Sequence, residues 1–199
     1  MFRFLFGLVI GVLLLPLAVL FWFHFGTVPV AVADPQLPAE RLITSVPLNA
    51  RIHREMIGNP PIQGDESTFS AGAQVYTDNC AVCHGFQGKP SAIGASMFPD
   101  APQLLQKHRI GDGVGVSDDP PGETYWKVYN GIRLTGMPAF KTQLSEKEMW
   151  QVSLLLANAD KQMPSAIQSV LRGEGGPAEG DAAPASNGAK TKAPAPGAH

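Results

Sequence analysis

Cys80, Cys83 and His84 stand together in the run Cys-Ala-Val-Cys-His, which holds both cysteines of this 199-residue chain. Two thiols three positions apart at the end of a helix reach the same edge of a flat macrocycle, where they can add to two vinyl groups. The histidine that follows then points at a metal in the macrocycle. The spacing therefore predicts one covalently attached haem c, with the neutral imidazole of His84 as the proximal iron ligand.

Other uses of the same run fit less well. A structural zinc site needs about four nitrogen or sulfur ligands, and the chain has two cysteines with the histidine directly adjacent to one of them. A thioredoxin-like redox pair needs a βαβ pattern, whereas the flanks here are helical and rich in Gly and Pro. A disulfide between residues so close would close almost no loop. Haem attachment remains the favoured interpretation.

A second iron ligand is needed to separate electron transfer from ligand chemistry. Met137 is our candidate, in the run Thr-Gly-Met-Pro-Ala-Phe that begins at Thr135. Its glycine permits close backbone approach and its proline stiffens the loop, so this is no ordinary helical core position. Met97 is a second candidate, and His53 and His108 are third choices in polar segments.

The stretch from about Phe69 to Ala159 resembles a single-haem class I cytochrome c domain, of the bacterial type grouped with cytochrome oxidase haem subunits. The matching pieces, besides the cysteine motif and the run containing Met137, are Gly72, Val75, Tyr76, Pro102-Gln103-Leu104, Asn130-Gly131 and Leu144-Ser145. The resemblance implies an all-α fold of about three to five helices around one covalently bound haem.

Several residue roles follow from this resemblance alone. In the family, the carbonyl of the proline corresponding to Pro102 accepts a hydrogen bond from the proximal imidazole, so Pro102 and Leu104 are expected beside the haem. Gly72 would let the last helix cross the first one closely, with Trp150 as its partner. Met137 would be the distal ligand. Residues 107–122 have no counterpart that we can identify.

Local signals in the sequence agree with this layout. Ser145 and Glu148 form a capping box before apolar residues at helical spacing. An earlier helix is expected over about 68–79, capped by a side chain within 65–68. A short helix around Tyr125–Tyr129 should end at Gly131. Strand signals are poor throughout the chain.

The start of the chain is apolar from Phe4 to Phe25 except for His24, which is long enough to span a bilayer. Arg3 and the amino terminus predict a cytoplasmic N-terminus, a single pass through a bacterial inner membrane and a periplasmic haem domain. A secretion signal cleaved after Ala33 is the alternative. Because signal peptides have shorter apolar cores, of about 7 to 15 residues, we favour an uncleaved anchor.

Composition divides the chain further. The expected parts are an anchor or signal over residues 1–26, a linker over 27–64, the haem domain over 65–164 and a disordered Gly/Ala/Pro-rich tail over 173–199. Residues 165–171 should add one or two helical turns before the tail. The linker carries a basic patch at Arg41, Arg51, His53 and Arg54. A short helix over 48–57 could touch anionic lipid or a partner subunit, although a solvated tether is the simpler interpretation.

Three hypotheses for function are compatible with these residues. With 15 basic and 17 acidic residues and no basic stripe, nucleic acid is not an expected partner. The favoured hypothesis is a membrane-tethered, non-enzymatic carrier of single electrons between redox proteins, with no small-molecule substrate. The alternatives are a haem subunit of a larger membrane oxidoreductase, or a haem enzyme or gas sensor with an open sixth site. Met137 argues against the last of these.

Overall fold

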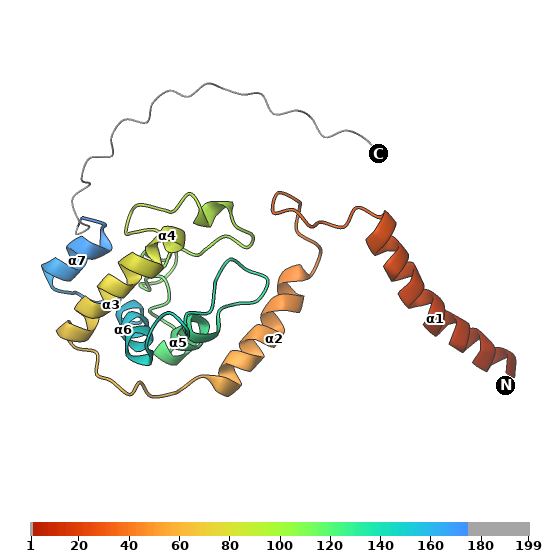
Figure 1. Cartoon of the computed structure of the whole chain (residues 1–199), viewed down its shortest axis with the longest axis horizontal. Helices are drawn as coiled ribbons and strands as arrows, with labels where there is room; N and C mark the ends of the chain where they lie inside the picture. Colours follow the sequence, from red (N-terminus) through yellow and green to blue (C-terminus); the bar gives the residue numbers. More distant parts are fainter. Residues whose placement is uncertain (1, 175–199) are drawn as a thin grey trace, which may run out of the picture.

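The structure is a computed structural model that describes residues 2–174, and within this range it is helical without a β-strand. The elements are α1 (Phe2–Phe25), α2 (Glu40–Glu55), α3 (Glu66–Asn79), α4 (Ala81–His84), the 3₁₀ turn η1 (Gly94–Ser96), α5 (Pro121–Asn130), α6 (Glu146–Leu156) and α7 (Ser165–Leu171). Figure 1 shows α2 to α7 gathered together, with α1 apart from them. The all-α prediction is confirmed. Most of the expected disordered tail, residues 175–199, lies outside the described residues.

Helices α3 and α6 cross closely at a glycine. A side chain on Gly72 would overlap the backbone carbonyl of Gln151, and it would also lie 3.2 Å from the Cβ of Leu155. The crossing expected from the sequence is therefore present. Its partner on α6 is the backbone at Gln151, however, and the expectation that Trp150 fills this role was wrong.

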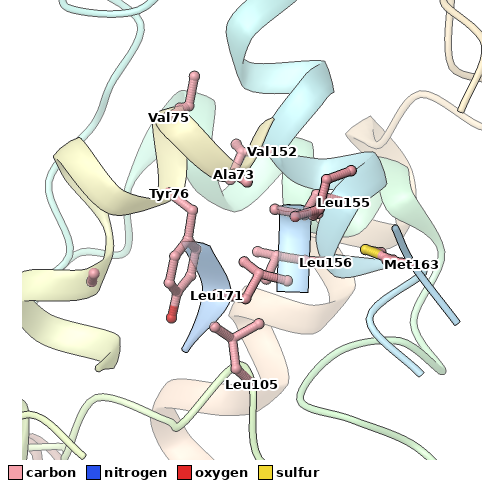
Figure 2. Close-up of a cluster of buried hydrophobic side chains, with 11 residues drawn as sticks. Ala73, Val75, Tyr76, Leu105, Val152, Leu155, Leu156, Met163 and Leu171 are labelled. Atoms are coloured by element: carbon pink, nitrogen blue, oxygen red, sulfur yellow. The ribbon is translucent and has the colours of Figure 1, made fainter. Parts of the chain in front are cut away.

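The main core lies between α3, α6 and α7. Tyr76, Val152, Leu155 and Leu156 are almost fully inaccessible to solvent and pack with Leu171 of α7, as Figure 2 shows. The hydroxyl of Tyr76 donates a hydrogen bond of 2.7 Å to the carbonyl of Gly85, which satisfies its one polar group. This bond ties α3 to the backbone that follows α4.

A second, smaller core joins α5 to α6. Trp150 stacks on Tyr125, with ring centroids 4.1 Å apart and planes inclined by 13°. Met149, Val128 and Phe140 complete the buried cluster, and Met137 packs against its edge. Because Trp150 packs against α5 in this cluster, the backbone of the next residue, Gln151, makes the contact with α3 at Gly72.

The helix ends follow the local signals. Asp65 accepts a hydrogen bond from the backbone N–H of Thr68 and caps α3, and Ser145 forms a complete capping box with Glu148 at the start of α6. Helix α5 ends at Gly131, whose φ of 67° suits a glycine stop. Helix α7 spans two turns. All four expectations are confirmed.

The linker contains more structure than the sequence predicts. A short helix was expected after Pro47, but α2 begins at Glu40 and continues through the proline to Glu55. Ile52 is 1% exposed, and Trp126 of α5 donates a hydrogen bond of 2.9 Å from Nε1 to Glu55. Contacts with α5 therefore stabilise a helix that its own sequence disfavours.

Helix α1 is, within the described residues, the one helix long and apolar enough to cross a membrane. None of its residues is buried against the rest of the chain. Both a membrane anchor and a secretion signal have these properties, so the choice between them stays a prediction.

Residues 107–115 form a turn that folds back on itself. The N–H of His108 donates to the carbonyl of Gly113 at 2.8 Å, and the N–H of Gly115 donates to the carbonyl of Gln106 at 3.0 Å. Gly115, with a φ of 59°, lies directly against the backbone of Leu104. This segment, which the resemblance left unexplained, closes one side of the Pro102–Leu104 loop.

Candidate haem-binding site

The two cysteines lie at the junction of two helices. Cys80 ends α3, with its N–H bonded to the carbonyl of Tyr76 at 2.8 Å, and its own carbonyl accepts from His84 at 2.9 Å and from Cys83 at 3.1 Å. A single turn thus separates the two sulfurs and presents both beside His84. Both cysteines are free and half-buried. Thioether formation requires two such free thiols.

Burial shapes the chemistry of the first thiol. It raises the pKa of Cys80 to about 12, and the neighbouring Cys83 adds to the same shift. The Cys80 thiol is therefore protonated at neutral pH.

The imidazole of His84 is held by one backbone group. Its Nδ1 lies 2.7 Å from the carbonyl oxygen of Pro102, and the ring N–H donates to that oxygen. Burial lowers the pKa of His84, while the bond to Pro102 acts in the opposite direction. This arrangement favours a neutral ring with the proton on Nδ1, which leaves Nε2 as a lone-pair donor.

The backbone after His84 fixes this arrangement. Gly85 has a φ of 70°, and a Cβ there would lie 2.9 Å from the side-chain oxygen of Gln103 and within contact of the carbonyl of Lys89. The turn that carries His84 therefore packs directly on the loop that supplies the Pro102 carbonyl. Only glycine allows this close approach in that conformation.

Met137 lies in a loop closed by hydrogen bonds at both ends. Phe140 donates to the carbonyl of Val128 at 3.0 Å, and the carbonyl of Met137 accepts from Ile132 at 3.2 Å. The N–H of Met137 donates to the Thr135 hydroxyl at 3.1 Å. Met137 itself is half-buried. The loop is thus an ordered support for the Met137 side chain, and the role of Met137 as an iron ligand stays a prediction.

Residues 94–97 link the cysteine motif to the Met137 loop. A Cβ on Gly94 would overlap the carbonyl of Cys83, so η1 rests directly on the motif. Three residues further on, the sulfur of Met97 lies 2.8 Å from the position of a Cβ on Gly136. The side chain of Met97 therefore lies against Gly136, the residue that precedes Met137 in the chain.

The remaining candidates lie in other surroundings. Leu104 packs against the main core, His53 is exposed on α2, and Nε2 of His108 lies 2.8 Å from the carbonyl of Gly115. His108 thus holds its own turn, and Leu104 lies two residues beyond the Pro102 carbonyl. Sequence reasoning did not identify Gly94, because a glycine gives no chemical signal until its neighbour is known. It assigned a close backbone approach to Gly136, but not the contact with Met97.

Two hollows on the described surface are lined by residues other than those of this motif. One of about 420 Å³ is lined by residues such as Gln87, Lys107, Lys161 and Gln168. Another of about 250 Å³ lies between residues 29–40 and the exposed side chains of Phe98 and Leu134. Neither contains the cysteines, His84 or Met137.

The donor set fits a covalently held haem. Two free thiols lie one helical turn apart, an oriented imidazole has an available Nε2, and the thioether of Met137 is carried by a hydrogen-bonded loop. No group of three or more His, Cys, Asp or Glu side chains among residues 2–174 is arranged to hold a bare metal ion. The all-helical fold and this motif together define a c-type cytochrome.

Comparison with known proteins supports the same conclusion. Residues 67–154 match the family described as cytochrome c oxidase, cbb3-type, subunit III. The cbb3-type cytochrome c oxidase subunit FixP of Sinorhizobium medicae is 29% identical over 128 residues, which is 60% of this chain and 39% of that protein. The cytochrome c subunit of the quinone alcohol dehydrogenase of Gluconobacter oxydans is 34% identical over 92 residues, 42% of this chain and 17% of that subunit. No solved structure matches the chain.

These matches concern a domain and not a whole protein. The chain spans about two fifths of the length of FixP and about a sixth of the dehydrogenase subunit. The matched region begins in α3 and ends in α6, so it contains the cysteine motif, the Pro102 loop and the Met137 loop. The matched domain is similar to the haem subunits of the cbb3-type oxidases.

Proposed function

We propose that this protein carries single electrons through one haem c held by Cys80, Cys83, His84 and Met137. The observation that supports this most directly is the bond between His84 Nδ1 and the Pro102 carbonyl, since it sets the tautomer that an iron-ligating histidine needs. A haem ligated by histidine and methionine supplies a reversible one-electron couple at a raised potential. Substrate chemistry is not part of this proposal.

The residues of the chain would support that one-electron couple by keeping the two iron ligands in fixed positions. The Pro102 carbonyl orients the imidazole of His84, and the hydrogen bonds of Thr135 and Ile132 hold the backbone of Met137. His84 and Met137 would both be ligands of the haem iron, and this would leave no open site for oxygen or a substrate. The bound haem would then supply outer-sphere electron exchange with a partner protein.

We further propose that α1 anchors the protein, with an N-terminus in the cytoplasm and residues 65–164 as a periplasmic haem domain. The apolar length of α1 supports an anchor. Arg3 supports the orientation, by the positive-inside rule. Detergent extraction compared with salt washing of bacterial membranes tests the anchor, and protease access to intact spheroplasts tests the orientation.

A second candidate is a haem subunit of a larger oxidoreductase, which differs in its partner and not in its chemistry. The relatives favour it, because both are named as subunits of multi-subunit enzymes. Purification in mild detergent distinguishes the two. A stoichiometric partner would support the subunit, and a monomer that is active in electron exchange would support the free carrier.

The visible spectrum of the purified protein tests the ligands. We expect a low-spin reduced spectrum unchanged by carbon monoxide, and a weak red methionine-to-iron band in the oxidised form. Met137→Ala should remove that band, lower the reduction potential and admit carbon monoxide, whereas His84→Ala should prevent a normal low-spin haem.

Met97→Ala is the matched control for the methionine assignment, because the Met97 sulfur lies against Gly136, the residue before Met137. It should keep the red band. If Met97→Ala removes the band and Met137→Ala does not, then Met97 is the ligand. A wild-type spectrum that is high-spin and shifts with carbon monoxide would replace electron transfer with sensing or catalysis.

A further inference from the structure

Helix α2 has two apolar faces, and the domain covers one of them. Within the helix, Ser45, Leu48 and Ile52 are the residues after Glu40 that are shielded from solvent, and their spacing of three and four residues places them on one side. That side packs on α5. The side chains that remain therefore form a free surface along the helix.

The free face begins with exposed apolar residues. Leu42, Ile43 and Val46 are 63%, 69% and 56% exposed, although each is a large aliphatic side chain. Leu42, Val46, Ala50 and Arg54 follow one another at intervals of four residues, so they form a continuous stripe. The stripe begins at Leu42, on the flank of the covered face, and reaches the side opposite Ile52 at Ala50 and Arg54. Ile43 lies beside this stripe at the end nearer α1.

The charges on this face have one sign. Acidic residues of α2 occur at its two ends, Glu40 and Glu55, and both are engaged. Glu40 accepts from the N–H of Leu37 at 2.8 Å, and Glu55 accepts from Trp126 and Arg51 at 2.9 Å each. Arg54 and His53, in contrast, are exposed at the end of the apolar stripe. An apolar surface followed by exposed basic groups is complementary to the acyl chains and phosphates of an anionic lipid surface.

The position of α2 in the chain agrees with this occupant. Residues 26–39 connect it directly to α1, the helix long enough to span a bilayer. The same connecting segment lines the hollow next to Phe98 and Leu134, so it runs along the domain before entering α2. A chain that leaves the membrane here brings the free face of α2 close to the lipid headgroups.

We propose that the free face of α2, formed by Leu42, Ile43, Val46, Ala50 and Arg54, lies on the surface of an anionic membrane and sets the orientation of the haem domain above it. This goes beyond electron transfer and rests on the proposed anchor. Leu42, Ile43 and Val46 enter the headgroup region, while Arg54 pairs with lipid phosphate. The opposite face keeps its contacts with α5.

Spin labelling of the full-length haem protein in lipid nanodiscs tests this proposal. Because Cys80 and Cys83 are consumed in thioether bonds, an introduced cysteine is the single reactive thiol. A nitroxide at Ile43→Cys should collide several-fold more with oxygen than with a water-soluble nickel chelate, relative to the same label at Ile110→Cys. Ile110 is the matched control, since it is an isoleucine that is 91% exposed in the turn over residues 107–115.

A change of lipid composition and a second variant test whether charge holds α2 on the membrane surface. The contrast between the two labels should be larger in discs with equal parts phosphatidylglycerol and phosphatidylcholine than in phosphatidylcholine alone. Adding Arg54→Gln to the Ile43 label should reduce that lipid dependence. His53 remains as the other exposed basic group on this side.

Three results would overturn the proposal, and each is distinguishable from failure of the proposed function. Equal accessibility of the labels at 43 and 110 places α2 in water. Shielding of the 43 label from both oxygen and nickel places it against protein, either a partner subunit or a second copy. Accessibility that is the same in both lipid mixtures removes the role of charge. A protein absent from the discs, or one with an abnormal haem spectrum, would instead contradict the anchor or the ligands.

Discussion

At the scale of single residues, the site depends on groups that have no reactivity of their own. Gly94 allows η1 to rest on the carbonyl of Cys83, and Gly136 leaves room for the sulfur of Met97. The Pro102 carbonyl is an ordinary backbone oxygen that gains importance because it lies 2.7 Å from His84. The reactive side chains identify the cofactor, and these neighbours set their positions.

Gly136→Ala tests this support for Met137. The added methyl group would lie 2.8 Å from the Met97 sulfur, so the flexible thioether or the loop must shift. We expect a loss of about 1 to 2 kcal/mol in the free energy of unfolding, together with a weaker red methionine-to-iron band. Denaturant titration and the oxidised spectrum measure the two effects.

Gly58→Ala is the control for that change, because a Cβ there meets nothing within 4 Å. It should be neutral or slightly stabilising, since alanine restricts the unfolded chain. If Gly136→Ala behaves like this control in both stability and spectrum, the Met97 contact does not position Met137.

At the scale of helices, two contacts decide how the elements are arranged. The backbones of α3 and α6 meet at Gly72, and α2 is joined to α5 through Glu55 and Trp126. The first brings the cysteine motif against the main core. The second makes part of the expected linker a packed helix.

Gly72→Ala should destabilise the protein by about 2 to 3 kcal/mol, because the new methyl group would overlap the rigid carbonyl of Gln151. Urea unfolding of the haem protein measures this loss. Ser70→Ala, at an exposed position of the same helix, should change stability little. If the two substitutions change the free energy of unfolding equally, α3 and α6 can move apart at Gly72 without loss of stability.

The joint between α2 and α5 should depend on pH. The hydrogen bond from Trp126, followed by that from Arg51, holds the pKa of Glu55 below its ordinary value. A carboxylate with a lowered pKa in the folded state stabilises that state above the ordinary glutamate pKa of about 4.3, and the contribution disappears as the pH falls through the folded value.

Glu55→Gln tests this dependence, because the amide keeps an acceptor for Trp126 without the charge. The wild type should unfold at a higher temperature than the variant at neutral pH, and the difference should shrink toward zero on acidification to about pH 3. Parallel curves over that range would show that the ionised carboxylate adds nothing to the joint.

The sequence predicts the elements with strong local signals better than it predicts their contacts. The caps at Asp65 and Ser145 and the stop at Gly131 depend on neighbours three or four residues away, so all three were predictable. The extent of α2 depends on its contact with Trp126, which is distant in sequence. Pro47 lies inside the helix, and a proline there normally predicts a helix end. The partner of Gly72 depends on how α6 is rotated about its axis, which the composition of that helix does not specify.

The candidate site divides in the same way. The spacing of the cysteines and His84 is enough to predict covalent attachment of haem. The family resemblance predicted the contact between His84 and Pro102, and the structure contains it. The proximity of Met97 to Gly136 arises from two loops that fold together, so neither loop alone reveals it. The choice of Met137 as ligand remains a prediction until the spectra are measured.

At the scale of the whole molecule, the protein domain is small and its cores are separate. One cluster joins α3, α6 and α7, and the other joins α5 and α6. A domain of this size buries limited apolar surface by itself. A haem attached at the motif would supply much of the interior that connects these clusters.

The Cys80→Ala, Cys83→Ala double variant should therefore yield an unstable apoprotein. We expect rapid proteolysis and no cooperative transition in calorimetry, because both thioether attachments are lost. The single Cys83→Ala variant, which keeps one attachment site, should retain a measurable transition. A protease-resistant, cooperatively unfolding double variant would show that the polypeptide folds without its cofactor.

The connection between α1 and α2 also limits where electrons can travel. Residues 26–39 can extend over at most about 50 Å, taking roughly 3.5 Å per residue. With α1 held in a bilayer, the domain searches a thin layer above one patch of membrane, and a partner anchored in that patch meets it at an effective concentration that reaches the millimolar range. Even a weak docking surface is then sufficient for turnover, and frequent release becomes an advantage, because a carrier that bound its partner tightly in so small a volume would seldom be free to visit the next one.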